Sequence, residues 1–302
     1  MNARKKQSGT LFLAPAASLM LVLSIFPLFY SLALTFSDMR IAAQEVHFVG
    51  LDNWKRLFSD ARFGATLINT FVFVVVGVTA QFLLGLALAV LLHQEFRGRR
   101  FFRISFLLPM MMSPVAISFV IGKLLFSEGV GPVTHLMQAL GMGPLLWSRS
   151  ALGSTMLLIA IDTWQWVPLF IVILLAGLQS IDGEVQEAAR VDGASRWQTF
   201  RYVTLPLLMP LCTVIILIRS LEAFKIIDII RVVTGGGPGS STESITTYAY
   251  TMGIKNGEIG YATTMAYVLL IAMTIYAVLF LKLARRVSNW KYSDNTPKEV
   301  SS

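Results

Sequence analysis

The fold is decided by the stretch Ser180-Ile-Asp-Gly-Glu-Val-Gln-Glu-Ala-Ala-Arg-Val-Asp-Gly-Ala-Ser-Arg-Trp-Gln-Thr-Phe-Arg-Tyr-Val-Thr-Leu-Pro206. Apolar blocks flank it on both sides, at Leu152–Leu178 and at Leu205–Leu221. A bare connector between two apolar helices would need only a few residues, whereas this stretch is long enough for two short helices. It therefore predicts a polar helical element held between two apolar helices.

Residue types place the ends of the first short helix. Asp182 is a favourable N-cap, and Glu184 in the first turn is stabilised by the helix dipole. Asp192-Gly193 is a stop signal, because glycine accepts the left-handed backbone that often follows a helix. The first helix is therefore expected to run from the cap at Asp182 to the stop at Gly193.

The second short helix has its own start signal. Ser195 and Gln198 fit a capping box, in which each side chain bonds the backbone N–H of the other residue. The helix is expected to continue into the next apolar block, so that the two short helices meet at Gly193. On the first helix, Ala188 and Ala189 leave a small, shallow surface that another protein can approach closely.

Composition places the rest of the chain in a membrane. Only 14% of the 302 residues are charged, compared with about 25% in a soluble protein. A membrane-crossing helix needs about 20 mostly apolar residues, and about six blocks meet this requirement. We therefore expect an all-α integral membrane helical bundle that forms a single domain over residues 1–302. The expected spans are Leu11–Phe36, Leu67–Leu92, Ile104–Phe126, Leu152–Leu178, Leu205–Leu221 and Tyr261–Leu283.

The positions of the basic residues predict the orientation, because cytoplasmic loops carry an excess of Lys and Arg. Basic residues precede the first block, gather between blocks two and three and between blocks four and five, and follow block six. With six spans these positions share one side of the bilayer, so both termini are expected to be cytoplasmic. The net charge of +8 is then explained without a nucleic-acid partner.

Polar and aromatic side chains inside the apolar blocks are candidates for lining a solute path, because intramembrane charges usually face a bundle interior or a water-filled cavity. A spacing of three is expected to place Arg219, Glu222, Lys225 and Asp228 along one helix face, either in the path or as an ion-pair ladder near the outer interface. Amides and aromatic rings suit sugars, although tryptophans also form interfacial belts. The candidates for the path are Asn69, Gln81, Trp164, Gln165, Arg219 and Glu222.

The sequence predicts no catalytic, cofactor or metal site. Gly235–Gly239 is glycine-rich but lacks the Gly-Lys-Ser/Thr ending of a phosphate-binding loop, and the expected orientation places it outside the cell. Cys212 is the only cysteine, and metal-ligand spacing is absent. We therefore expect a chain that is not an enzyme and has no nucleotide site of its own.

Several motifs together resemble a known family. Glu187-Ala188-Ala189, Asp192-Gly193-Ala194 and Leu205-Pro206 resemble the EAA loop of binding-protein-dependent ABC transporter permeases. The flanking sequence motifs resemble those of the sugar-type permeases of the maltose and glycerol-3-phosphate class. Leu13-Ala14-Pro15 resembles the corresponding segment in the first of the two permease partners of that class. The flanking motifs are Trp164-Gln165-Trp166-Val167-Pro168, Phe224-Lys225-Ile226-Ile227-Asp228 and Thr234-Gly235-Gly236-Gly237-Pro238-Gly239. One departure is Asp182-Gly183, where many relatives have proline.

The resemblance implies a type I ABC importer permease fold in the cytoplasmic (inner) membrane of a bacterium. The coupling loop, residues 180–204, would seat its first helix in a groove of a cytoplasmic ABC ATPase dimer, which hydrolyses the ATP. A second permease, favoured to be a related but different chain, would complete the path, and an extracytoplasmic binding protein would deliver a sugar or related solute. The coupling residues are Glu187, Ala188, Ala189, Asp192 and Gly193.

Other classes of protein remain open at this point. An ion-coupled carrier or channel would not need a two-helix cytoplasmic loop, and the inverted repeats common in carriers are not visible. An intramembrane enzyme would need acids, nucleophiles or metal ligands that converge within the spans. EAA loops also occur in permeases for non-sugar substrates, and a monosaccharide, disaccharide, polyol or sugar phosphate all fit the resemblance.

Overall fold

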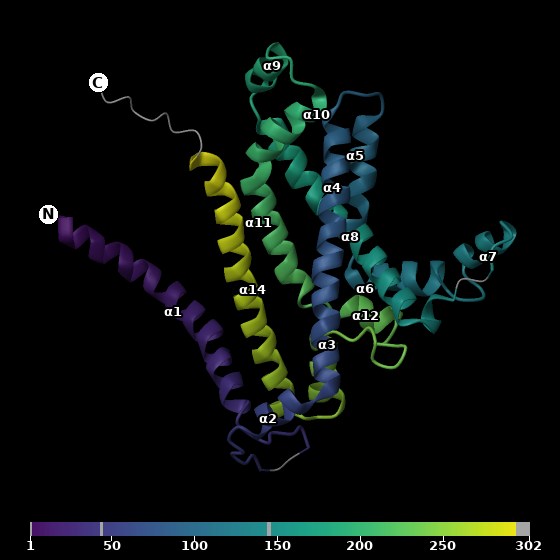
Figure 1. Ribbon diagram of the computed structural model, residues 1–302. Coiled ribbons are helices and arrows are strands. Elements are labelled where there is room, and N and C mark those ends of the chain that lie inside the picture. The colour runs from purple at the N-terminus through teal and green to yellow at the C-terminus, as the bar shows by residue number, and fades with distance from the viewer. Residues whose placement is uncertain (1, 43–44, 144–145, 294–302) are drawn as a thin grey trace. The chain divides into compact units, whose positions relative to one another are not determined.

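The computed structural model describes residues 2–42, 45–143 and 146–293, and within them the side chains at positions 15–16 and 18–286 (Figure 1). In these ranges the regular elements are helices, with two isolated β-bridges. The α-helices are α1 (Asn2–Leu34), α2 (Asp52–Ser59), α3 (Ala61–Val72), α4 (Val78–His93), α5 (Arg99–Leu107), α6 (Pro114–Ile117), α7 (Pro132–Ala139), α8 (Ala151–Ser180), α9 (Gly183–Val191), α10 (Arg196–Thr199), α11 (Leu205–Ala223), α12 (Asp228–Val233), α13 (Ile245–Tyr250) and α14 (Ile259–Ser293). Short 3-10 or π-helical segments are η1 (Phe73–Gly77), η2 (Leu108–Met111), η3 (Ser118–Leu125), η4 (Trp147–Arg149), η5 (Phe200–Thr204) and η6 (Thr251–Lys255).

The described chain holds four helices that are long and apolar enough to cross a membrane, or five if one bent pair counts as a span. α1 adds a shorter apolar helix over Ser18–Leu34. Each predicted apolar block thus lies largely within a helix or a helical pair, while the number of spans stays a prediction. The four long helices are Ala61–His93, Ala151–Ser180, Arg196–Ala223 and Ile259–Arg286.

The third apolar block differs from a single continuous helix. Predicted as one span over Ile104–Phe126, it consists of α5 with η2 and α6 with η3, which are bent by 101° relative to each other. Pro114 opens the second piece, and Ser113 before it has the extended backbone that a following proline favours. The Ser113 Oγ then accepts a hydrogen bond from the Ala116 N–H at 3.2 Å and caps the new helix.

The chain divides into two compact units. The first unit comprises Met1–Gly64 and Tyr248–Leu270, and the second unit comprises Ala65–Thr247 and Ile271–Ser302. The second unit contains α4, α8 and α11, together with the polar stretch 180–206. It therefore holds most of the candidate functional residues.

In the second unit, glycines allow the long helices to approach closely. A Cβ atom added at Gly85 of α4 would lie 2.3 Å from the Phe170 Cβ of α8, and one at Gly177 of α8 would lie 2.5 Å from the Leu211 Cδ2 of α11. Small residues at helix contacts are typical of membrane bundles, where dispersion rather than the hydrophobic effect drives association. These contacts set how α4, α8 and α11 pack.

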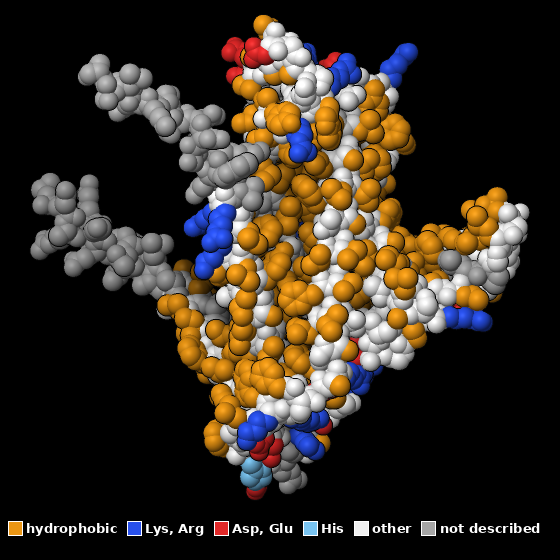
Figure 2. Space-filling model, in the orientation of Figure 1, with side chains coloured by type: hydrophobic (Ala, Val, Ile, Leu, Met, Phe, Trp, Pro, Cys, Tyr) orange, Lys and Arg blue, Asp and Glu red, His pale blue; other side chains and the backbone are white. Residues whose placement is uncertain are grey.

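The outward flanks of these helices are apolar. Leu83, Leu84 and Leu91 of α4 and Val214 and Ile218 of α11 are all exposed. Figure 2 shows hydrophobic side chains along the long helices of the second unit and charged side chains gathered at the end that carries α9 and α10. A helix surrounded by lipid needs this distribution, whereas a water-soluble protein rarely exposes such a surface.

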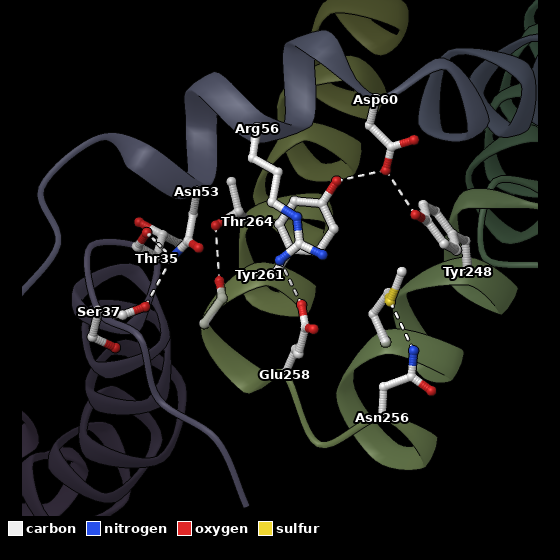
Figure 3. A network of polar contacts seen from close by, with 12 residues as sticks. Thr35, Ser37, Asn53, Arg56, Asp60, Tyr248, Asn256, Glu258, Tyr261 and Thr264 are labelled. Carbon is white, nitrogen blue, oxygen red and sulfur yellow. Dashed lines mark hydrogen bonds and ion pairs between the residues drawn. The ribbon is translucent and has the colours of Figure 1, made fainter. Parts of the chain in front are cut away.

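In the first unit, a network of polar contacts holds α2 (Figure 3). Asp60 accepts hydrogen bonds from the hydroxyls of Tyr261, at 2.6 Å, and Tyr248, at 2.7 Å. Partial burial acts to raise the pKa of Asp60, but these bonds and two backbone N–H donors outweigh it, so the pKa of Asp60 lies below its usual range. The Arg56 guanidinium lies 4.0 Å above the Tyr261 ring and pairs with Glu258 at 2.6 Å. The carboxylate of Asp60 is therefore held ionised between two tyrosines.

The close approach at Gly85 predicts a stability difference between two otherwise identical substitutions. Gly85→Ala places a methyl group against Phe170 and is expected to lower stability by about 1–3 kcal/mol through overpacking. Gly64→Ala in α3 meets no atom within 4 Å and should be neutral or stabilising by up to about 1 kcal/mol. Thermal unfolding of both purified variants in one detergent checks this, and equal midpoints would contradict the packing described.

Candidate functional site

The first candidate site is the short helix α9, which follows α8 after a sharp turn. Asp182 caps it by accepting a hydrogen bond on Oδ1 from the Glu184 N–H at 3.1 Å. No residue of α9 is buried. Glu187 and Ala188 are exposed and Ala189 is partly exposed, so these side chains are open to a partner.

The end of α9 is closed by backbone bonds around Gly193. The N–H groups of Gly193 and Ala194 donate to the carbonyls of Arg190 and Ala189, each at 3.0 Å. Gly193 has a φ of +78°, a conformation in which a side chain would be strained. The predicted stop at Gly193 is therefore confirmed.

The second short helix starts with the predicted capping box. The Gln198 N–H donates to the Ser195 Oγ at 3.3 Å, and the Ser195 N–H donates to the Gln198 Oε1 at 2.8 Å. From there α10, η5 and α11 form one continuous apolar helix over Arg196–Ala223. The exposed helix α9 is thus joined, through a well-capped corner, to a helix that is long enough to cross a membrane.

The second candidate site is a buried polar cluster to which α4, α8 and α11 each contribute. The Arg219 side chain is 3% exposed, and its Nη2 lies 2.5 Å from the Asp162 Oδ2. Its Nε donates to the Gln81 Oε1 at 2.9 Å, and the Gln81 Nε2 donates to the same Asp162 oxygen at 2.7 Å. The Trp166 ring lies 4.8 Å from the guanidinium carbon. Every charged group in the cluster therefore has a partner, as a low-dielectric site requires.

A cavity of about 210 Å³ lies beside this cluster. Its lining includes both members of the buried ion pair and both members of a second pair, in which the Lys225 Nζ lies 2.8 Å from the Glu222 Oε1. The Gln165 Nε2 reaches the Met112 carbonyl only at 3.5 Å, and its buried Oε1 has no hydrogen-bond partner in the described chain. The polar lining residues are Asp162, Gln165, Trp166, Arg219, Glu222, Lys225 and Asp228.

The predicted path residues do not all meet at this cavity. Gln81 and Arg219 lie in the cluster, and Gln165 and Glu222 line the cavity. The two others lie elsewhere. Asn69 donates to the Glu243 carbonyl at 3.1 Å, and Trp164, 48% exposed, lies on the outward side of α8. The structure therefore groups four of the six candidates.

The four charges expected on one helix face do not share one helix, because α11 ends at Ala223 and α12 begins at Asp228, but all four line the cavity. Arg219 pairs with Asp162 in the buried cluster, whereas Glu222 and Lys225 keep the spacing of three and form an exposed ion pair. Sequence reasoning also missed Asp162. A signal was present, since Asp162 is the only charged residue between Ala151 and Ser180, and intramembrane carboxylates mark functional or paired sites.

Comparison with known proteins points to one family. The family described as "Binding-protein-dependent transport system inner membrane component" matches residues 81–289, more than half of the chain. The trehalose/maltose transport system permease protein MalF of Thermococcus litoralis is 30% identical over 285 residues, covering 94% of this chain and 96% of that protein. The multiple sugar-binding transport system permease protein MsmF of Streptococcus mutans is 33% identical over 291 residues, covering 95% of this chain and 99% of that protein.

Solved structures support the fold. A chain of a bacterial alginate ABC transporter, solved with an alginate pentasaccharide-bound periplasmic protein, matches with a TM-score of 0.82. The identity is 20%, and the match covers 94% of this chain and 96% of that chain. The helical membrane fold expected from the sequence is therefore confirmed.

The buried ion pair predicts strong coupling between two substitutions. Asp162→Leu leaves Arg219 buried without a counter-charge, which is expected to cost about 3–5 kcal/mol. Replacing both partners with apolar residues of similar size, in Asp162→Leu with Arg219→Met, should restore most of that stability. The midpoints of thermal unfolding of the single and double variants check this, and purely additive losses would show that the two charges do not depend on each other.

Proposed function

Because the chain belongs to the family of binding-protein-dependent transport system inner membrane components, we propose that it forms half of the translocation path of an ATP-driven importer for a sugar or related solute. It is a permease subunit of the inner membrane, and the proposal adds how it is energised and what it carries. The observation that carries the coupling role is the exposed, doubly capped helix α9.

α9 is the helix that would seat in a groove of the ATPase. Its residues Glu187, Ala188 and Ala189 are accessible, and Asp192 and Gly193 close its end. The capping box at Ser195 connects α9 to a helix of 28 residues. This helix is about 42 Å long at 1.5 Å per residue. That helix carries Arg219 near its far end, so movement of α9 would reach the cluster that joins α4, α8 and α11.

The proposal includes three partners. A cytoplasmic ATPase dimer would bind α9 and hydrolyse ATP, since the glycine-rich stretch Gly235–Gly239 of this chain lacks the lysine of a phosphate-binding loop. A second, related permease would supply the other half of the path. An extracytoplasmic binding protein would deliver the solute on the opposite side, with both termini of this chain in the cytoplasm.

The substrate class is supported by the relatives and by the cavity. The names of the two relatives specify trehalose, maltose and multiple sugars. The cavity presents an aromatic ring at Trp166 and an amide with a free oxygen at Gln165, groups that suit the C–H faces and hydroxyls of a sugar. Both of its cations, Arg219 and Lys225, are already paired with carboxylates. An uncharged sugar therefore fits this lining better than an anionic one.

The coupling role predicts uncoupled variants. Gly193→Pro cannot adopt the positive φ at the end of α9, and Glu187→Lys reverses an exposed charge on its surface. In proteoliposomes that hold the complete transporter, each should lower sugar uptake by roughly tenfold, a typical size for coupling between sites, while the protein still inserts in the membrane. ATPase activity should persist without responding to the loaded binding protein.

The matched control is Glu95→Lys, which makes the same charge change at an exposed position in the loop after α4. It should transport normally. Wild-type uptake by both Gly193→Pro and Glu187→Lys would remove the assignment of α9 as the coupling helix.

The pairing of Arg219 and Lys225 with carboxylates predicts that the cavity selects neutral over anionic sugars. The purified permease pair should bind neutral sugars more tightly than the matching sugar phosphates or uronic acids, because an anion would meet three lining carboxylates and two neutralised cations. Calorimetry without the binding protein isolates the cavity from the selectivity of that protein. Equal affinity for a sugar and its phosphate would contradict this interpretation.

A further inference from the structure

A larger cavity, of about 750 Å³, lies between the end of α4 and the two short helices of the coupling loop. His93 closes α4, Arg190 comes from α9, and Arg196 opens the helix that continues into α11. The same lining carries hydroxyl groups from Ser195 and Thr199. The cavity therefore brings three basic residues and further polar groups to one place.

The positive groups in this cavity lack partners. Its lining contains no carboxylate, and no ion pair of Arg190 or Arg196 is present in the described part of the chain. The Nδ1 of His93 is buried without a hydrogen-bond partner among the described residues. Buried polar groups are nearly always satisfied in folded proteins, so a phosphate oxygen that enters here would give the Nδ1–H tautomer of His93 a partner, while the two exposed arginines would balance its charge.

An apolar groove continues from the cavity along the side of α4. It has a volume of about 440 Å³ and shares Val90, Arg196 and Phe200 with the cavity. The rest of its apolar wall is formed by Leu83, Leu86 and Ala87 of α4 and by Trp197. A ligand that occupies both spaces would have a phosphate at one end and a hydrocarbon chain at the other.

The position along the helices fits a membrane boundary. His93 ends the long apolar helix Ala61–His93, and Arg196 begins the long apolar helix Arg196–Ala223. Trp197 beside Arg196 is 65% exposed, as is common for tryptophans at the depth of lipid headgroups. The cavity therefore lies where a headgroup would be, and the groove extends towards the acyl chains.

We propose that the cavity and groove bind one anionic phospholipid, with its phosphate between His93, Arg190 and Arg196 and an acyl chain along Leu83–Val90. The planar guanidinium groups can each bond phosphate oxygens in a two-pronged fashion. Because Arg190 lies on α9 and His93 on α4, the bound lipid ties the coupling loop to a membrane-spanning helix. The lipid composition of the membrane then sets how freely α9 moves.

Native mass spectrometry of the purified full-length chain tests the proposal. Wild-type protein should retain phosphatidylglycerol in preference to phosphatidylcholine with the same acyl chains. Arg190→Gln with Arg196→Gln should weaken phosphatidylglycerol binding by roughly tenfold or more, the loss expected when charge-assisted hydrogen bonds are removed. Ala87→Trp, which fills the groove without changing the charge, should weaken it as well.

The matched control is Arg97→Gln with Arg201→Gln, which removes two exposed arginines that do not line the cavity. This variant should bind phosphatidylglycerol as the wild type does. Equal retention by the Arg190/Arg196 and Arg97/Arg201 double variants, or displacement of the lipid by inorganic phosphate at comparable concentration, would overturn the proposal. Since all four arginines are exposed, neither double variant is expected to unfold. The measurement uses no sugar, ATPase or transport, so failure of the transport proposal would leave its outcome unaffected.

Discussion

The burial of Arg219 is the constraint on which the second unit depends. An unpaired guanidinium at 3% exposure would be too costly to keep, so α8 must present Asp162 and α4 must present Gln81 at matching heights. One charge therefore fixes the axial register of three helices that dispersion alone would hold less specifically. The close contacts at Gly85 and Gly177 also contribute to this packing, because they bring the backbones of α4, α8 and α11 close enough for Gln81, Asp162 and Arg219 to form hydrogen bonds.

This arrangement links the two candidate sites mechanically. The helix that carries Arg219 begins at the capping box beside α9, and that corner is bonded through both backbone and side chains. A force on α9 is therefore not absorbed by a loose linker. At the other end of the same helix, α11 stops at Ala223, and the chain bends before α12 begins at Asp228. Residues of the bend line the cavity beside the ion pair, so displacement of one helix would change the volume of that cavity.

Local signals in the sequence were sufficient to predict the helices of the loop 180–204, but not to predict the cavity beside Arg219. The caps at Asp182, Gly193 and Ser195 depend on neighbours within a few residues, and all three occur as predicted. The 101° bend at Ser113 and the end of α11 depend on packing against other helices, which periodicity cannot reveal. Asp162 is a further example. The sequence shows a carboxylate in an apolar block, but it does not show its partners Gln81 and Arg219, which lie 81 and 57 residues away in the chain.

The two polar cavities of the second unit differ in whether their charged side chains are paired, and this difference indicates the charge of the ligand that each would bind. Around Arg219 the protein supplies every counter-charge itself, which leaves the cavity suited to a ligand without charge. Around Arg190 and Arg196 no described residue supplies one, although Asp182, Glu184 and Glu187 lie in the same loop. The basic residues that set the orientation of a membrane protein do so by their preference for the anionic, cytoplasmic surface. The cavity gathers such residues at the ends of two long apolar helices, beside an apolar groove, and a phospholipid bound as proposed would turn that general preference into a defined position. If α9 is the coupling helix, as proposed, a lipid bound there would act on the same few side chains that bias the orientation.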